Sequence, residues 1–174
     1  MQEDVSKQEN ARRTSPDNFY YIMYTYDQES PLGMSIGFLN RDEWAIYLKI
    51  KMNQGIFKGK IDDTFEPNIY QPTGKTQEAN ISFSMGTTFK LFNPLWGYLG
   101  GGYGMYTRFD EVNLVDGSSA GWKRNKDETS KTLYPELGLN LKIANSVALN
   151  YGVMYHKEII HQFGVGFLLD TNIN

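Results

Sequence analysis

The strongest constraint in this chain of 174 residues is a period-two alternation of side-chain character. From residue 32 onward, seven stretches alternate bulky uncharged residues with small or polar ones. They are preceded by a stretch over 19–27 that is aromatic-rich on both parities. This period is the signature of β-strands whose two faces differ. The predicted strands cover 19–27, 32–39, 43–52, 79–91, 96–108, 132–143, 146–156 and 160–169.

The two parities predict which face of the strands points outward. One parity contains residues such as Leu137, Leu149 and Val165 and no Asp, Glu, Lys or Arg in these seven stretches; the other is rich in glycine, serine and asparagine. The interior of an eight-stranded barrel is just wide enough for side chains to fill it, so the bulky parity belongs outside. A small or polar interior and an uncharged exterior predict an all-β, eight-stranded, antiparallel up-and-down transmembrane β-barrel. A soluble lipocalin-like barrel that binds a small ligand is the alternative, and it would place the apolar face inside.

The connections between the strands support the same prediction. The long connections, 53–78 and 109–131, are the third and fifth, so both emerge at one end of the barrel. The second, fourth and sixth are tight turns, with turn-forming residues such as Asn40-Arg41-Asp42 and Asn93-Pro94. Short turns at one end and long loops at the other are typical of outer-membrane barrels.

Composition narrows the function classes. The net charge of −3 gives no basic field for nucleic acid, and the absence of cysteine excludes disulfides and thiolate metal sites. We expect no cofactor and no metal. Residues 1–17 are polar and lack the apolar core of a signal peptide. We expect an exported protein whose signal peptide is absent from this chain, with a flexible polar arm at 1–17, a barrel at 18–169 and a tail at 170–174.

The last predicted strand carries the most specific motif. Barrel-assembly machinery reads a terminal-strand signal of a polar residue, a glycine, an aromatic and a final aromatic or apolar residue. Gln162, Gly164, Phe167 and Leu169 occupy its defining places, although the strand ends in Leu rather than Phe and five residues follow. Over about 19–169 the chain resembles the small OmpA/OmpX-type outer-membrane barrels. The resemblance implies a Gram-negative outer membrane, contact with its lipid, and the assembly machinery as a partner during insertion.

Aromatic residues near the predicted strand ends suggest girdles at the level of the lipid headgroups. The candidates are Phe38, Trp44, Phe89, Trp96 and Phe167 at the turn end, and Tyr26, Tyr103 and Tyr155 at the loop end.

Charged residues predicted to face the lumen are the candidates for a site. Glu136 is the only acid among them, and a charge inside a narrow barrel must be paired or hydrated. We therefore expect Glu136 to pair with Arg108 or a nearby lysine, in a lumen cluster of Glu136, Arg108, Lys49 and Lys51. The cluster is interpreted either as a packed ionic plug among tyrosines or as a gate or anion-binding lumen.

The predicted function follows from the long loops, because binding residues are often carried on loops held by a rigid scaffold. We expect a structural, adhesion or docking role toward an extracellular or outer-membrane protein, and no general pore. A lipid A-modifying enzyme is a further alternative, since His156 and His161 flank one outer connection. No serine is found at a spacing that would place it beside either histidine, so no catalytic residue is assigned and the chain is predicted not to be an enzyme.

Overall fold

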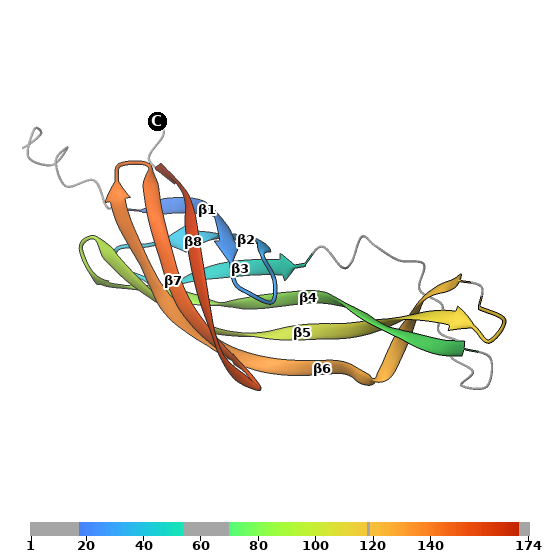
Figure 1. The fold of residues 1–174 in the computed structure, drawn as a ribbon. Coiled ribbons are helices and arrows are strands. Elements are labelled where there is room, and N and C mark those ends of the chain that lie inside the picture. Colours follow the sequence, from blue (N-terminus) through green and yellow to red (C-terminus); the bar gives the residue numbers. More distant parts are fainter. Residues whose placement is uncertain (1–17, 54–69, 118, 171–174) are drawn as a thin grey trace, which may run out of the picture.

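The computed structural model describes residues 18–53, 70–117 and 119–170, and they form one closed antiparallel barrel (Figure 1). Each strand pairs with the next along the chain, and β1 pairs with β8 to close the ring. No helix among these residues is long and apolar enough to cross a membrane. The strands are β1 (Phe19–Tyr26), β2 (Leu32–Leu39), β3 (Ala45–Met52), β4 (Tyr70–Phe92), β5 (Leu95–Leu114), β6 (Ser119–Ala144), β7 (Val147–His156) and β8 (Glu158–Asp170).

The predicted sidedness of the strands is confirmed. Leu137 is 55% exposed and Val165 50%, whereas Glu136 is 1% exposed. The parity of β1, which the sequence left open, is also clear. Tyr21 and Met23 point into the barrel and Ile22 points out. The soluble alternative, which needs the apolar residues inside, is therefore wrong.

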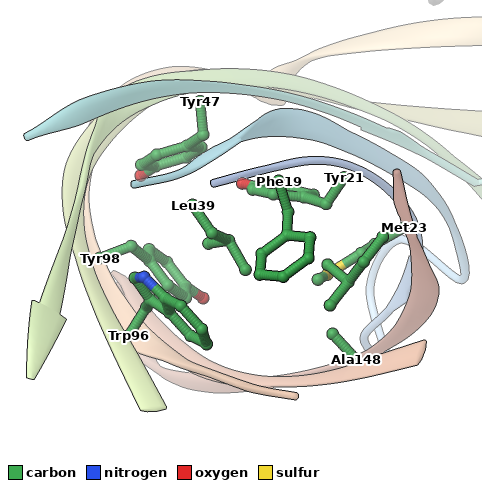
Figure 2. Close-up of a cluster of buried hydrophobic side chains, with 9 residues drawn as sticks. Phe19, Tyr21, Met23, Leu39, Tyr47, Trp96, Tyr98 and Ala148 are labelled. Atoms are coloured by element: carbon green, nitrogen blue, oxygen red, sulfur yellow. The ribbon is translucent and has the colours of Figure 1, made fainter. Parts of the chain in front are cut away.

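Aromatic side chains fill the barrel interior toward its turn end (Figure 2). The rings of Tyr47 and Tyr98 meet edge to face with their centroids 5.3 Å apart. Glycines make room for these rings. A Cβ at Gly138 would stand 2.6 Å from the Tyr98 ring, and one at Gly86 2.7 Å from the Tyr47 ring. Small residues on one strand thus accommodate large ones on another, and the lumen is packed.

Trp96 corrects one prediction. It was expected in the girdle at the turn end, but its side chain is fully buried inside the barrel. Its indole N–H donates to the Asn40 carbonyl oxygen over 3.0 Å, so the buried polar group is satisfied. The physical reason is parity, because Trp96 shares the inward face of β5 with Tyr98.

Three strands run far beyond the predicted boundaries. β4, β5 and β6 have 23, 20 and 26 residues, and Figure 1 shows them projecting past the rest of the barrel. Much of what the sequence predicted as loop at 53–78 and 109–131 is therefore strand, while 54–69 and 118 lie outside the described residues, as do 1–17 and 171–174. We call residues 70–77, 109–114 and 119–130 the projecting sheet. The projecting sheet does not have one apolar and one polar face. The period-two contrast that revealed the barrel strands is therefore missing there.

A bulge bends β6 where the projecting sheet leaves the barrel. Tyr106 pairs with Ser130, but Arg108 pairs with Asn125. Five steps along β6 are therefore matched by two steps along β5. The side chain of Asn125 accepts hydrogen bonds from the backbone N–H groups of Asp127 and Glu128, over 3.1 and 3.2 Å. Such bulges re-aim side chains, and Glu128, which lies within this one, pairs with Arg108.

Candidate functional site

The first charged group inside the barrel is centred on Glu136. Lys49 Nζ lies 3.0 Å from one carboxylate oxygen, and the Tyr47 hydroxyl donates to the other over 2.7 Å. Lys49 also donates to the side-chain oxygen of Gln162 over 2.9 Å and stands 4.7 Å from the centre of the Tyr98 ring. The pair is neutral overall, buried, and saturated with partners, as a packed ionic plug requires.

A second buried ion pair lies nearer the loop end. Lys51 Nζ is 2.8 Å from Asp27 Oδ2 and 3.1 Å from the sulfur of Met154. The backbone N–H of Ser30 donates to the other Asp27 oxygen over 2.7 Å. Sequence reasoning missed Asp27 because the parity of β1 was open. Assigning Tyr21 and Met23 inward would have placed Asp27 inward as well.

Arg108 does not join the predicted lumen cluster. It pairs with Glu128 and, over 3.3 Å, with Asp110, and its side chain is partly exposed. Glu136 faces Gly100 across the β5–β6 ladder. Eight further residues of extended strand then carry Arg108 roughly 26 Å away. The structure thus brings Lys49 to Glu136, gives Lys51 a different partner, and leaves Arg108 at the mouth of the barrel at its loop end.

The mouth of the barrel at the loop end holds a small pocket of about 160 Å³, called the mouth pocket below. His156 is stacked flat on Tyr106 with ring centroids 3.9 Å apart, and its Nδ1 lies 3.8 Å from Glu29 Oε2. Burial, followed by the nearby carboxylates of Asp27, Glu158 and Glu78, raises the pKa of Glu29. The lining residues are Glu29, Glu78, Asn80, Tyr106, Thr107, Arg108, Glu128, Ser130, His156 and Lys157.

Ser130 in this pocket corrects the expectation that no serine would lie near either histidine. The closed ring brings Ser130 and His156 to one cavity although 26 residues separate them, because Ser130 pairs with Tyr106, on whose ring His156 is stacked; sequence spacing could not reveal this. Neither Ser130 Oγ nor a ring nitrogen of His156 has a hydrogen-bond partner, so no nucleophile–base contact is formed. His161 points outward from β8, where its Nδ1 meets the Tyr151 hydroxyl over 2.8 Å.

The outer face of the barrel shows which environment surrounds it. It is a continuous ring of exposed apolar side chains, far beyond the scattered patches of a soluble monomer. Examples from all eight strands are Ile22, Met34, Ile46, Phe83, Met85, Leu99, Leu137, Leu149, Phe163 and Val165. This protein is an eight-stranded transmembrane β-barrel. Trp44, Phe38 and Phe167 are exposed toward its turn end, and Tyr26, Tyr103 and Tyr155 toward its loop end, as expected of girdle residues.

Comparison with known proteins finds similar chains among solved structures alone. No protein-family model and no curated protein matches the sequence. Among solved structures, the chain is similar to Ail, the attachment invasion locus protein of Yersinia pestis, in complex with the heparin analogue sucrose octasulfate (TM-score 0.49, 12% identity, 87% of this chain and 95% of that chain). It is also similar to the N-terminal β-barrel domain of Pseudomonas aeruginosa OprF (TM-score 0.48, 13% identity, 87% and 96%). A third is Neisserial surface protein A (TM-score 0.38, 16% identity, 87% and 91%).

These neighbours are small eight-stranded outer-membrane barrels, the class of protein that the sequence resembles over about 19–169. At such low identity and TM-score, they transfer no ligand or activity to this chain. The fold of this barrel is established by its own strand pairing and apolar exterior.

The residues of the predicted assembly signal all lie on β8. Phe167 and Leu169 point outward, whereas Gln162 is fully buried and accepts the hydrogen bond from Lys49. Gly164 faces Asn150 across the β7–β8 ladder. Gln162 therefore has a place in the packed interior of the barrel that is independent of any signal, and recognition by assembly machinery stays a prediction.

Proposed function

We propose that this barrel resides in the outer membrane and presents the projecting sheet outside the cell as a docking platform for another protein. In this proposal the chain is exported, contacts the assembly machinery during insertion, and contacts outer-membrane lipid afterwards. The observation that carries the proposal is the length of β4, β5 and β6 beyond the ring. Strand that extends past the lipid-facing barrel is not needed to span the membrane.

Cross-strand contacts hold the projecting sheet in one shape. Glu111 accepts a hydrogen bond from Thr73 over 2.8 Å and pairs with Lys75 at 3.1 Å, and both contacts lower the pKa of its carboxyl. The side-chain amide of Asn125 donates to Asp110 over 2.8 Å. Val112 is completely buried. A preorganised surface loses less conformational entropy on binding than a flexible loop, which suits a docking role.

We also propose that the barrel is not a general pore, and its packed interior supports this. Two neutralised ion pairs and the rings of Tyr47 and Tyr98 occupy the lumen. Transport through it would require several buried partners to separate. The barrel is therefore proposed to act as an anchor, with binding at its outer surface.

Replacing residues 54–77 and 109–126 with short Gly-Ser turns tests the docking role. Cells carrying the parent or this variant would be compared for adherence to host cells and for proteins cross-linked within native outer membranes. The matched control changes Arg41 and Asp42 to serine, at the opposite end of the barrel. We expect loss of adherence or of a cross-linked partner only in the first variant, with both variants still folded. Equal adherence and an equal set of partners would reject the proposal.

A lipid A-modifying enzyme is the second candidate, favoured by one observation. Ser130, His156 and Glu29 line the same mouth pocket. Mass spectrometry of lipid A from cells expressing the parent, Ser130→Ala or His156→Ala would reveal this activity. An acyl-chain change present with the parent and absent with both variants would establish it, and an unchanged profile with the parent would exclude it.

A further inference from the structure

The mouth pocket contains buried polar atoms without partners. His156 is 5% exposed, and neither of its ring nitrogens makes a hydrogen bond. Glu29 Oε2, Tyr106 Oη and Ser130 Oγ, which belong to the same lining, are also without hydrogen-bond partners. Buried polar groups are nearly always satisfied, and each exception calls for an explanation such as a bound molecule. Four side chains with the same deficit around one cavity indicate an occupant.

Two of these unpartnered atoms, Glu29 Oε2 and the unprotonated nitrogen of His156, require a hydrogen-bond donor. A carboxylate oxygen can only accept, and a neutral imidazole offers one accepting nitrogen. Glu29 Oε2 and His156 Nδ1 are 3.8 Å apart, too far for a direct hydrogen bond and a span that one donor between them can bridge. Tyr106 and Ser130 contribute hydroxyl oxygens that also accept. The pocket therefore suits a group with several N–H bonds.

The charge of the pocket favours a cation. The guanidinium group of Arg108, which lines the pocket, is already neutralised by Glu128 and Asp110. Glu29 and Glu78 then outnumber Lys157 among the remaining charged residues of the lining. Burial and the neighbouring carboxylates raise the pKa of Glu29, so a bound cation would favour its ionised form. The face of the stacked Tyr106 ring adds a surface that attracts cations.

We propose that the mouth pocket binds the primary ammonium group of a small alkylamine, with Glu29 and His156 as its acceptors. An ammonium carries three N–H donors and one positive charge, which matches the unpartnered acceptors and the acidic surplus. A cavity of about 160 Å³ admits the ammonium and a short alkyl chain. A metal ion fits less well, because no cluster of three or more His, Cys, Asp or Glu residues suited to a metal occurs in the described part of the chain. An anion would meet Glu29 and Glu78 unpaired.

The two histidines of the chain provide a direct test. The full protein, labelled with ¹³C-histidine and folded in detergent micelles at pH 8, would be titrated with 1,4-diaminobutane and with methylammonium. We expect a saturable shift of the His156 ring signal and none of the His161 signal, which reports on the outer face. Tetramethylammonium has the charge but no N–H, and sodium chloride matches the ionic strength; neither is expected to shift His156 in a saturable way.

Two variants separate recognition from general electrostatics. Glu29→Gln removes the accepting charge and keeps the shape, and it should weaken amine binding about tenfold or more. Glu158→Gln removes a nearby acid that does not line the pocket, and it should change the affinity less than about threefold. No saturable shift in the parent, equal binding of tetramethylammonium, or unchanged affinity in Glu29→Gln would each overturn the proposal. The pocket would then hold water alone.

Discussion

Single residues inside the barrel show why its lumen is closed. Lys49 and Glu136 are both buried, so each would be an uncompensated charge without the other. The cost of removing charges from water is offset by their mutual contact and by the bonds from Tyr47 and to Gln162. A buried pair of this kind contributes little compared with apolar residues of the same shape, yet breaking it from one side is strongly unfavourable.

Lys49→Met alone should therefore destabilise the barrel more than Lys49→Met combined with Glu136→Leu. The single variant leaves Glu136 buried without its cation, and we expect the free energy of unfolding to fall by about 3–5 kcal/mol. Lys49→Met combined with Glu136→Leu should recover most of that loss. Urea unfolding in lipid vesicles, followed by tryptophan fluorescence, measures both values. A double variant no more stable than the single one would mean that the lysine contributes through packing and not through charge.

The sequence predicted which charged residues lie inside, but not all of their partners. Parity alone places Glu136 and Lys49 in the lumen, because every second residue of a strand shares a face. Pairing also depends on the register between strands far apart in sequence. That register sets Gly100, not Arg108, opposite Glu136. It also sets Ser130 opposite Tyr106, whose ring stacks on His156.

At the scale of strands, glycines set how closely the aromatic rings approach the barrel wall. A Cβ at Gly152 would overlap the Tyr98 hydroxyl and lie 2.9 Å from Tyr98 Cζ. A Cβ at Gly101, on the outer face of β5, would meet only the Tyr134 carbonyl oxygen, at 3.2 Å. Gly152, on the inner face, and Gly101, on the outer face, therefore allow the same substitution to be compared on the two faces of the barrel.

Gly152→Ala should lower the free energy of unfolding by about 1–3 kcal/mol, because it overpacks the interior. Gly101→Ala should change it by less than about 1 kcal/mol. Adding Tyr98→Phe to Gly152→Ala removes the overlapping hydroxyl and should restore part of the loss. The measurement is again urea unfolding in vesicles. Equal effects at Gly152 and Gly101 would show that the close contact with Tyr98 is not limiting.

Phe167 and Phe163 separate the role of β8 in assembly from its role in stability. Both side chains are exposed on the outer face of the strand, 66% and 55%. Only Phe167 occupies a defining place of the assembly signal. Phe167→Ala should therefore reduce the folded protein in outer membranes several-fold, and Phe163→Ala should not. Heat-dependent gel mobility of membrane fractions measures this, and refolding into detergent should be equal for both. Equal losses in cells would remove the support for the signal.

Strand prediction succeeded where the environment of the two faces differs. The ends of β2, β7 and β8 agree within two residues with the alternation in the sequence. β4 begins at Tyr70 and not near residue 79, and β6 begins at Ser119 and not near residue 132. Residues such as Thr73, Lys75 and Asn125 are polar in a segment that projects beyond the rest of the barrel. Hydrogen bonding along the ladder, and not an apolar face, makes that segment a sheet.

For the whole molecule, the apolar outer face and the side chains that fill the lumen together determine whether ions can pass through the barrel. The predicted inside-out distribution of apolar residues is confirmed by the exposed ring around the barrel and the buried ion pairs within it. Eight strands enclose a lumen that side chains can fill completely. Here they do so with Tyr47, Tyr98 and Trp96 in addition to the charges. An ion crossing the barrel would need to displace both aromatic and ionic contacts at once.

Planar-bilayer recordings should therefore detect no large, steady single-channel current from the parent protein. Changing Tyr47, Tyr98, Lys49 and Glu136 together to serine removes the central part of the filling while leaving the outer face unchanged. Provided that the variant retains the heat-dependent gel shift of a folded barrel, we expect it to conduct in small steady steps. Large steady currents from the parent would contradict the closed lumen. A folded but silent variant would show that the Lys51–Asp27 pair or the aromatic layer around Trp96 closes the barrel without the central cluster.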